Sequence, residues 1–475
     1  MQDLRQWMEE VENRGELKRI DGADWDLEIG CIAALDTKSK SCPAILFDNI
    51  KDYPEGYRIL TGALNRPGRL SLALGFPYTG STRELLDLLK AKLPACEKDA
   101  LVYAPQVVSG GPILENVDQG DQIDLYKFPA PRWNELDGGR YIGTGCAIIT
   151  RDPDTEAVNL GTYRVMIHDK KTVALQISAG KHGQLDYKKY HTRGERAPVA
   201  ITIGQHPLIL ALGGVEVPHE GLSEYHFAGA LLNKPVDVIE EEVTGLPIPA
   251  NAEIVIAGFS PPDREMIEGP FGEFLGYYGR KKLHPVIEVE RVYYRNQPII
   301  LGAPPNRPPS DCSYFIAIIR SAMLHNQLAG LGIPDIKAVW MDDTGQQQLV
   351  IISVKQKYPG HAKQAAVLAC QSRLVPIGKY VIAVDDDIDP TNIQDVIWAL
   401  CTRSDPEKSI DIIRRAWSSP LDTIIPNSAG AFVNSRAVIE ACKPFEWMDE
   451  FPKEIRASPE LVAKVKQKWG DKLGF

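Results

Sequence analysis

The pattern of apolar and polar positions predicts a small α/β domain in the first 110 residues. Between Asp3 and Gly15 apolar residues recur at helical spacing, which is typical of an amphipathic helix that Asp3 caps. Short apolar strands and further helical patterns alternate up to about residue 105, before Gly110-Gly111-Pro112 opens a connecting stretch. The strands are expected at 17–20, 44–47 and 58–61, and the helices at 69–74 and 82–93.

Strand patterns dominate from about residue 115 to residue 300, and several of them alternate with a period of two. A single helix is predicted among them, at 223–232. Many strands around one helix are typical of a barrel or sandwich that encloses a ligand. The strands are expected at 146–150, 158–167, 172–177, 199–204, 208–212, 236–243, 253–257 and 286–295.

Beyond residue 305 helices and strands alternate again, which predicts a second α/β domain. The tail at 459–475 is predicted to be a charged helix with a thin apolar stripe. Such a terminal helix is expected to dock on a neighbouring subunit, so we expect a homodimer or a homohexamer. The other helices are expected at 314–327, 362–373 and 391–403, and the strands at 337–341, 349–354 and 380–384.

Composition narrows the possible partners and compartments. A chain of 475 residues exceeds what one hydrophobic core usually serves, so two or three domains are expected. The net charge of −10 argues against a nucleic-acid or anionic-membrane partner, so any anionic ligand needs a local basic site. The eight cysteines include no C-x-x-C pair, which favours reduced thiols over disulfides or a zinc site. Because no signal-peptide region or long apolar run appears, we expect a soluble cytoplasmic protein.

Two glutamates bracket a tight turn, Glu268-Gly269-Pro270-Phe271-Gly272-Glu273. Glycine and proline make such a connection rigid, so it can hold both carboxylates toward one cleft. Burial and mutual repulsion would raise the pKa of one carboxyl into the range of a general acid, while a nearby arginine keeps the other ionised. Arg164, in the segment Asn159-Leu160-Gly161-Thr162-Tyr163-Arg164, is a candidate arginine. The residues alone leave open the ordinary alternative of two solvated acids and an exposed strand arginine.

Asn159, His182 and Glu224 together form a mixed oxygen and nitrogen ligand set for a hard divalent ion such as Mg2+ or Mn2+. Glu224 follows Ser223 at a predicted helix start, where the helix dipole favours an anion. Taken by themselves, the three residues fit ordinary roles better: a turn amide, a surface histidine and a first-turn helix acid. Lys379, just before a predicted strand, could neutralise a phosphate, although a lysine in that position is usually solvated.

Several motifs, spread over nearly the whole chain, resemble those of the UbiD family of decarboxylases that use prenylated FMN. Each motif alone is modest evidence, whereas together they are highly specific. They are Asn-x-Gly-x-Tyr-Arg at 159–164, Ser-Glu-Tyr-x-Phe-Ala-Gly at 223–229, Glu-Gly-Pro-Phe-Gly-Glu at 268–273, Gly-His-Ala-Lys at 360–363, and Asp-Asp-Asp-Ile-Asp followed by Ile-Trp-Ala-Leu within 385–400.

The resemblance implies a multidomain α/β fold with an N-terminal α/β domain (1–110), a central split β-barrel that binds prenyl-FMN (111–305), a C-terminal α/β domain (306–455) and an oligomerisation helix (456–475). It also implies residue roles. Arg164, Glu268 and Glu273 match the catalytic set of the family. Asn159, His182 and Glu224 match the ligands of a Mn2+ or Mg2+ ion that ties the cofactor phosphate to the protein, with K+ nearby. The positions that match cofactor-binding residues are Thr162, Tyr163, Arg164, Gln176, Lys181, His182 and Lys379.

The expected function is therefore the reversible non-oxidative decarboxylation of an aromatic or heteroaromatic carboxylic acid, with CO2 released. The modified flavin accepts the electrons, Arg164 orients the carboxylate beside Glu268, and Glu273 protonates the carbon. A flavin prenyltransferase would supply the cofactor.

The match to the family departs in one place. Some relatives that act on phenolic acids carry a histidine in the C-terminal part of the pocket, whereas the last histidine here is His361. That absence and the apolar stretch at 417–427 favour a flat aromatic or heteroaromatic acid over a polyhydroxylated one. The alternatives are a catalytically silent flavin-binding or assembly subunit and a metal-assisted hydrolase that needs no flavin. The intact pair Glu268 and Glu273 argues against the silent subunit.

Overall fold

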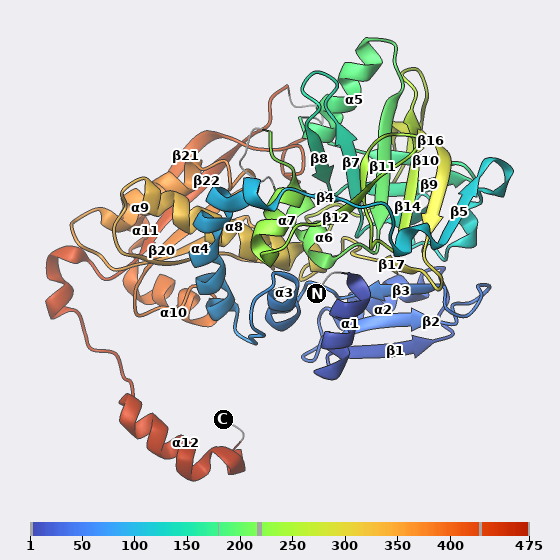
Figure 1. Cartoon of the computed structure of the whole chain (residues 1–475). Coiled ribbons are helices and arrows are strands. Elements are labelled where there is room, and N and C mark those ends of the chain that lie inside the picture. Colours follow the sequence, from blue (N-terminus) through green and yellow to red (C-terminus); the bar gives the residue numbers. More distant parts are fainter. Residues whose placement is uncertain (1–2, 179, 216–220, 427–429, 474–475) are drawn as a thin grey trace.

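The described residues form both helices and strands, and the strands make four sheets. This confirms the predicted α/β class with several structural parts. The computed structural model describes residues 3–178, 180–215, 221–426 and 430–473. In Figure 1 the N-terminal strands lie below the central sheet and the C-terminal sheet lies beside both. The last helix, α12 (Pro459–Leu473), stands away from the rest of the molecule (Figure 1). The four domain boundaries given above stay predictions.

The N-terminal sheet is built from three early strands and one strand that arrives much later. The capping role of Asp3 is present, because its Oδ1 accepts a hydrogen bond from Gln6 N at 2.8 Å. β17 pairs in parallel with β3, so the chain returns to this sheet after it has completed the central one. The elements are α1 (Leu4–Asn13), β1 (Leu17–Asp21), α2 (Glu28–Asp36), β2 (Ala44–Asp48), β3 (Arg58–Thr61), α3 (Pro67–Ala73), α4 (Thr82–Asp99) and β17 (Ile299–Leu301).

The central sheet is antiparallel and has the order β6-β9-β10-β16-β14-β11-β7-β8, with β5 and β15 paired to β16. β8 ends at Gly161 and β9 begins at Arg164, although these strands lie near opposite ends of that order. Only Thr162 and Tyr163 span the gap, and an extended residue covers at most about 3.6 Å. The sheet must therefore curl until its two ends approach each other, and Arg164 lies at the opening between them.

The elements of the central region have the following bounds. The sheet contains β5 (Asn116–Gln119), β6 (Arg140–Gly143), β7 (Ala147–Arg151), β8 (Val158–Gly161), β9 (Arg164–Asp169), β10 (Thr172–Gln176), β11 (Ala197–Ile203), β14 (Ile254–Ser260), β15 (Glu265–Glu268) and β16 (Lys282–Tyr294). A small sheet beside it contains β4 (Gln106–Val107), β12 (Asp237–Glu240) and β13 (Pro247–Pro249). The helices of this region are α5 (His182–Thr192), α6 (Pro207–Gly213) and α7 (Glu224–Leu232).

Three sequence predictions for the central region are wrong, namely one strand at 158–167, one strand at 208–212 and a single helix. The single strand predicted at 158–167 is two strands, because the chain crosses from one end of the sheet to the other at Thr162 and Tyr163. The strand predicted at 208–212 is the helix α6, and α5 was also missed, so three helices replace the one expected.

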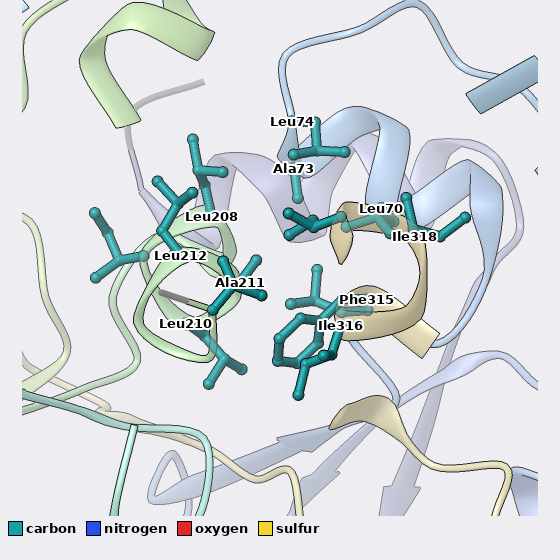
Figure 2. Close-up of a cluster of buried hydrophobic side chains, with 14 of the residues drawn as sticks. Leu70, Ala73, Leu74, Leu208, Leu210, Ala211, Leu212, Phe315, Ile316 and Ile318 are labelled. Carbon is teal, nitrogen blue, oxygen red and sulfur yellow. The ribbon is translucent and has the colours of Figure 1, made fainter. Parts of the chain in front are cut away.

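The helix α6 shows why periodicity failed at 208–212. His206 caps α6 by accepting a hydrogen bond from Leu208 N at 3.2 Å, and Pro207 opens its first turn. Its apolar side chains are buried on all sides, so their spacing cannot separate a helix from a buried strand. Figure 2 shows Leu208 and Leu212 in one cluster with Leu70 of α3 and Phe315 of α8 (Asp311–Gly330).

The C-terminal sheet has the order β18-β19-β20-β22-β21, and the six elements predicted between 314 and 403 are present. Two further strands, β21 and β22, were not predicted. Arg415 has a φ of 57° inside β21, where the register shifts, and this bulge breaks the period-two pattern. The elements are α8 (Asp311–Gly330), β18 (Ile336–Met341), β19 (Leu349–Val354), α9 (His361–Gln371), β20 (Tyr380–Asp385), α10 (Ile393–Arg403), α11 (Pro406–Ser409), β21 (Ile410–Trp417) and β22 (Val433–Ala441).

Short 3-10 helices complete the chain. They are η1 (Ala100–Tyr103), η2 (Pro112–Glu115), η3 (Gly120–Gln122), η4 (Leu125–Lys127) and η5 (Phe445–Glu450). Two predicted features extend beyond the described residues: Asn427 of the apolar stretch at 417–427, and residues 474–475 of the tail helix.

Candidate active site

Arg164 is shared between the two glutamates of the predicted turn. Its Nε and Nη2 donate to Glu268 Oε1 and Oε2 at 2.8 and 2.7 Å, and its Nη1 donates to Glu273 Oε1 at 2.8 Å. The Arg164 side chain is 9% exposed and Glu268 is 0% exposed, whereas Glu273 is 29% exposed. The structure thus brings the three predicted residues together, with Glu268 held on both oxygens and Glu273 held on one.

The local fold explains this convergence. Arg164 opens β9 directly after the crossing from β8, and Glu268 is the last residue of β15. Gly269 turns the chain with a φ of 85°, a conformation that side chains with a Cβ rarely adopt. On the other side, Gly138 N donates to Pro270 O at 2.8 Å, and a Cβ on Gly138 would lie 2.1 Å from Gly269 O. The segment before β6 is therefore pressed against the turn.

An aromatic pair supports the ion cluster. Tyr141 OH donates to Glu268 Oε1 at 2.8 Å, so that oxygen accepts from both Tyr141 and Arg164. The rings of Tyr141 and Phe271 stack with centroids 3.8 Å apart, and the Arg164 guanidinium lies 5.4 Å from the Phe271 ring. The Phe271 of the turn thus has a packing role beneath the charges.

The electrostatics favour a permanent cation beside two acids. Burial alone lowers the pKa of Arg164, but the hydrogen bond and the charges of Glu268 and Glu273 outweigh burial and raise that pKa. Burial and then Glu268 raise the pKa of Tyr141, so its phenol stays a donor. Burial also raises the pKa of Asp137 to about 6, despite hydrogen bonds from Asn134 N and Trp133 N. The second oxygen of Asp137, Oδ1, is buried without a hydrogen-bond partner in the described chain.

The three predicted metal ligands lie on elements that contact one another. Glu224 starts α7, and its Oε2 accepts a hydrogen bond from Leu160 N at 2.8 Å, which places it beside Asn159 on β8. Asn159 Nδ2 donates to Thr150 Oγ1 at 3.3 Å, and Thr150 donates to Asp186 of α5 at 2.6 Å. His182 is the first residue of α5, one turn before Asp186.

The buried position of Glu224 has a consequence for cation binding. Burial raises the pKa of Glu224 to about 7, so a bound cation would be needed to keep it fully ionised near neutral pH. Within the described residues, no group of three or more His, Cys, Asp or Glu side chains is arranged to hold a metal ion. The predicted set contains only two residues of those types and one amide, so it stays a prediction.

Most of the predicted cofactor residues lie at the opening of the curled sheet. Thr162 N donates to Gly213 O at 3.0 Å, which ties the crossing to α6. Gln176 ends β10 directly opposite Arg164 in the strand register, and Lys181 is the N-cap of α5. Lys379 lies instead directly before β20 of the C-terminal sheet, and its Nζ pairs with the buried Asp422 at 2.7 Å.

Three residues of this site were not predicted from the sequence, namely Tyr141, Asp137 and Asp186. Tyr141 and Asp137 belong to the segment Asp137-Gly138-Gly139-Arg140-Tyr141, whose paired glycines signal a close backbone approach. Asp186 follows His182 at helical spacing, which puts both on one face of α5. Neither signal names a partner without the tertiary structure.

Among the helices of the described residues, none combines the length and the apolar character that a membrane span requires.

Known protein families match this chain along most of its length. Three models of 3-octaprenyl-4-hydroxybenzoate carboxy-lyase (UbiD) match it: the N-terminal domain at residues 8–89, the Rift-related domain at 106–308 and the C-terminal domain at 313–441. The central model covers the whole Arg164, Glu268 and Glu273 cluster.

Individual relatives agree over almost the full length. A phenolic acid decarboxylase of Streptomyces sp. (strain D7) is 31% identical over 453 residues, which are 93% of this chain and 92% of that protein. The open form of vanillic acid decarboxylase from Sedimentibacter hydroxybenzoicus has a TM-score of 0.87 at 30% identity and covers 100% of both chains. The UbiD-class enzyme HmfF from Pelotomaculum thermopropionicum, in complex with FMN, has a TM-score of 0.86 at 28% identity and covers 99% of this chain and 100% of that one. The chain belongs to the UbiD family of carboxy-lyases.

Proposed function

We propose that this carboxy-lyase decarboxylates an aromatic or heteroaromatic carboxylic acid with prenylated FMN as cofactor. The observation that carries the proposal is the buried arginine shared by two glutamates, of which one accepts its hydrogen bonds on both oxygens and the other on one. Relatives named as phenolic acid and vanillic acid decarboxylases support the substrate class. The HmfF complexes with FMN and with prFMN support the cofactor class.

The geometry divides the labour between the two acids. Glu268 accepts three hydrogen bonds and is fully buried, so it serves as a fixed anion that holds Arg164. A substrate carboxylate can compete with Glu273 for Arg164 Nη1, since this is the single bond between Arg164 and Glu273. Glu273 is then free to carry a proton to the carbon that loses CO2, and because it is partly exposed it regains a proton from solvent.

The cofactor site is proposed at the opening of the curled sheet. When bound, the modified flavin supplies an electron sink for the carbon–carbon bond electrons. Thr162, Tyr163 and Gln176 line that opening, and Lys181 stands at the start of α5. Lys379 is already paired with Asp422, so its role as a phosphate partner requires that this pair opens or is shared.

The proposal includes a divalent cation held by Asn159, His182 and Glu224. Glu224→Ala should lose metal and flavin together, because without the bridging cation nothing in the proposed ligand set compensates the negative charge of the flavin phosphate. Metal content and flavin absorbance of the purified variant measure this, and Glu240→Ala, at an exposed acid of β12, is the control. Full flavin occupancy in Glu224→Ala would show that the metal assignment is wrong.

The function is tested by co-expression with a flavin prenyltransferase. The purified protein should show the absorbance of a modified flavin and release CO2 from at least one acid of a panel of vanillate, hydroxybenzoates and pyrrole-, furan- and indole-carboxylates. Bound modified flavin without CO2 release from any acid would instead favour a silent flavin-binding subunit. Hydrolytic activity in flavin-free protein would favour a metal-assisted hydrolase.

Assembly through α12 is also proposed. Four apolar residues of this helix are exposed because the helix stands apart from the rest of the molecule (Figure 1). A second copy of the chain would cover them. They are Leu461, Val462, Val465 and Trp469. Light scattering at micromolar concentration should give at least a dimer, and a monomeric mass would refute the proposal.

A further inference from the structure

Tyr141 is the one uncharged side chain that donates a hydrogen bond to the Arg164, Glu268 and Glu273 cluster among the described contacts. Its phenol reaches Glu268 Oε1 at 2.8 Å and is fully buried. Glu268 Oε1 therefore has two donors, Tyr141 OH and Arg164 Nε. A hydrogen bond to a buried carboxylate is among the stronger ones, because no water can replace it.

The mounting of Tyr141 is rigid on both its backbone and its ring. Its backbone N donates to Pro131 O at 2.9 Å, and its carbonyl accepts from Trp133 Nε1 at 3.4 Å. Its ring stacks on Phe271, which belongs to the turn between the two glutamates. A donor fixed in this way sets the orientation of the Glu268 carboxylate plane and not merely its charge.

The orientation of Glu268 determines the direction of Nη1, the third guanidinium nitrogen of Arg164. The guanidinium is planar, so two bonds to Glu268 fix the direction of Nη1, which is the nitrogen that reaches Glu273 at 2.8 Å. We propose that Tyr141 is a positioning residue of the reaction: by holding Glu268 it aims Arg164 Nη1 at the place where Glu273 and the substrate carboxylate exchange. This inference rests on the proposed function for its kinetic consequence, and on the geometry alone for its structural one.

The chain provides a matched control. Tyr293 OH donates to Glu241 Oε1 at 2.7 Å and is also buried, but it lies on β16 and takes no part in the Arg164 cluster. Tyr141→Phe and Tyr293→Phe each keep the ring and remove a hydrogen bond to a glutamate, and Tyr293→Phe also removes the hydrogen bond that Arg291 Nη1 donates to its hydroxyl at 3.3 Å. Tyr293→Phe should therefore lose at least as much thermal stability as Tyr141→Phe.

Catalysis should separate the two variants. With cofactor-loaded enzyme, Tyr141→Phe should lower kcat about tenfold with a KM change of less than about threefold, because the lost interaction aims a group used in the reaction. Tyr293→Phe should keep the wild-type kcat and KM.

A structural readout keeps this inference apart from the proposed function. In crystals of cofactor-free protein, Tyr141→Phe should lengthen the contact of Arg164 Nη1 with Glu273 beyond hydrogen-bonding distance, whereas Tyr293→Phe should retain it. Equal kinetic effects in the two variants, or an Arg164–Glu273 contact that is unchanged in Tyr141→Phe, would overturn the positioning role. If wild-type enzyme releases no CO2 from any acid, the proposed function fails, and the crystal structures still decide whether Tyr141 positions Arg164.

Discussion

Two buried clusters of arginine and glutamate share their charges in opposite ways. At the candidate active site Arg164 serves two acids, Glu268 and Glu273. Beside the N-terminal helix α1, Glu253 pairs with two arginines. Arg5 donates to both of its oxygens at 2.8 and 2.7 Å, and Arg295 donates to Oε1 at 3.2 Å. In both clusters the fully buried glutamate is held by a bidentate arginine. The difference lies in the third member, which is an acid in one case and Arg295 in the other, and Arg295 Nη1 also donates to Asp3 Oδ2 at 3.0 Å.

That difference indicates which cluster can do chemistry. An excess acid beside a fixed ion pair can exchange its partner for a substrate carboxylate and can carry a proton. An arginine stays charged at any pH that the fold survives, and the Asp3 that pairs with Arg295 caps α1 through its other oxygen, so the Glu253 cluster has a structural role. Its bonds join α1 to the central sheet and to the turn after β16, because Arg5 also donates to Asn296 O at 2.8 Å. We therefore expect loss of activity from one cluster and loss of stability from the other.

The largest expected effect is on turnover. Glu273→Gln keeps the size and the hydrogen bond from Arg164 but cannot deliver a proton, so kcat should fall by roughly a hundredfold or more. The free energy of unfolding should change by less than about 1 kcal/mol, since Glu273 is partly exposed. CO2 release in cofactor-loaded enzyme and deuterium incorporation at the carbon that lost CO2 measure the effect.

Glu265→Gln, at an exposed acid on the same strand β15, is the control for Glu273→Gln and should behave as wild type. A Glu273→Gln variant that turns over and incorporates deuterium at the wild-type rate would remove Glu273 from the mechanism.

The second expected effect is on stability. Burial outweighs both arginines and raises the pKa of Glu253, so the intact cluster contributes little net stability. Its disruption is nevertheless costly, because Glu253→Gln leaves Arg5 beside an uncharged group, while Arg295 keeps its pair with Asp3. The free energy of unfolding should fall by roughly 2–4 kcal/mol, somewhat less than for a fully buried pair because Arg5 is 33% exposed.

Urea denaturation measures this loss, and kcat of the remaining folded enzyme should be unchanged. Glu12→Gln breaks the exposed pair with Arg19 and should cost at most about 0.5 kcal/mol. If Glu253→Gln impairs turnover as strongly as Glu273→Gln does, the contrast between the clusters is wrong.

The same contrast shows how far the sequence alone predicts the site. The turn at 268–273 announces its two acids through glycine and proline, and the family motifs in the sequence link that turn to Arg164. Glu253 and Arg5 are separated by 248 residues and carry no local signal, so only the tertiary fold pairs them. Tyr141 was missed for the same reason. The strands and helices with clear periodicity were predicted, whereas α6 was not, because a segment buried on all sides loses the polar face that marks its period.

The smallest expected effect concerns the stability that the buried carboxyl of Asp137, near Arg164, costs the fold. The buried Oδ1 of Asp137 has no hydrogen-bond partner among the described residues, and Arg164 lies near enough to lower its pKa only slightly against burial. Burial raises the pKa of Asp137 from 3.8 to about 6. A carboxyl with a higher pKa in the folded state takes up a proton on folding, so its ionisation destabilises the fold above about pH 6. Below about pH 4 both states are protonated and the cost disappears.

Asp137→Asn removes this charge and leaves a side-chain oxygen for the N–H groups of Trp133 and Asn134. The free energy of unfolding should rise by roughly 1–2 kcal/mol at pH 7, after allowance for partial solvent screening, and the gain should shrink steadily toward pH 4. Urea denaturation at a series of pH values measures the gain, and Asp263→Asn, at an exposed acid, should give a flat difference. A constant or inverted difference for Asp137→Asn would mean that Asp137 is already compensated in the fold.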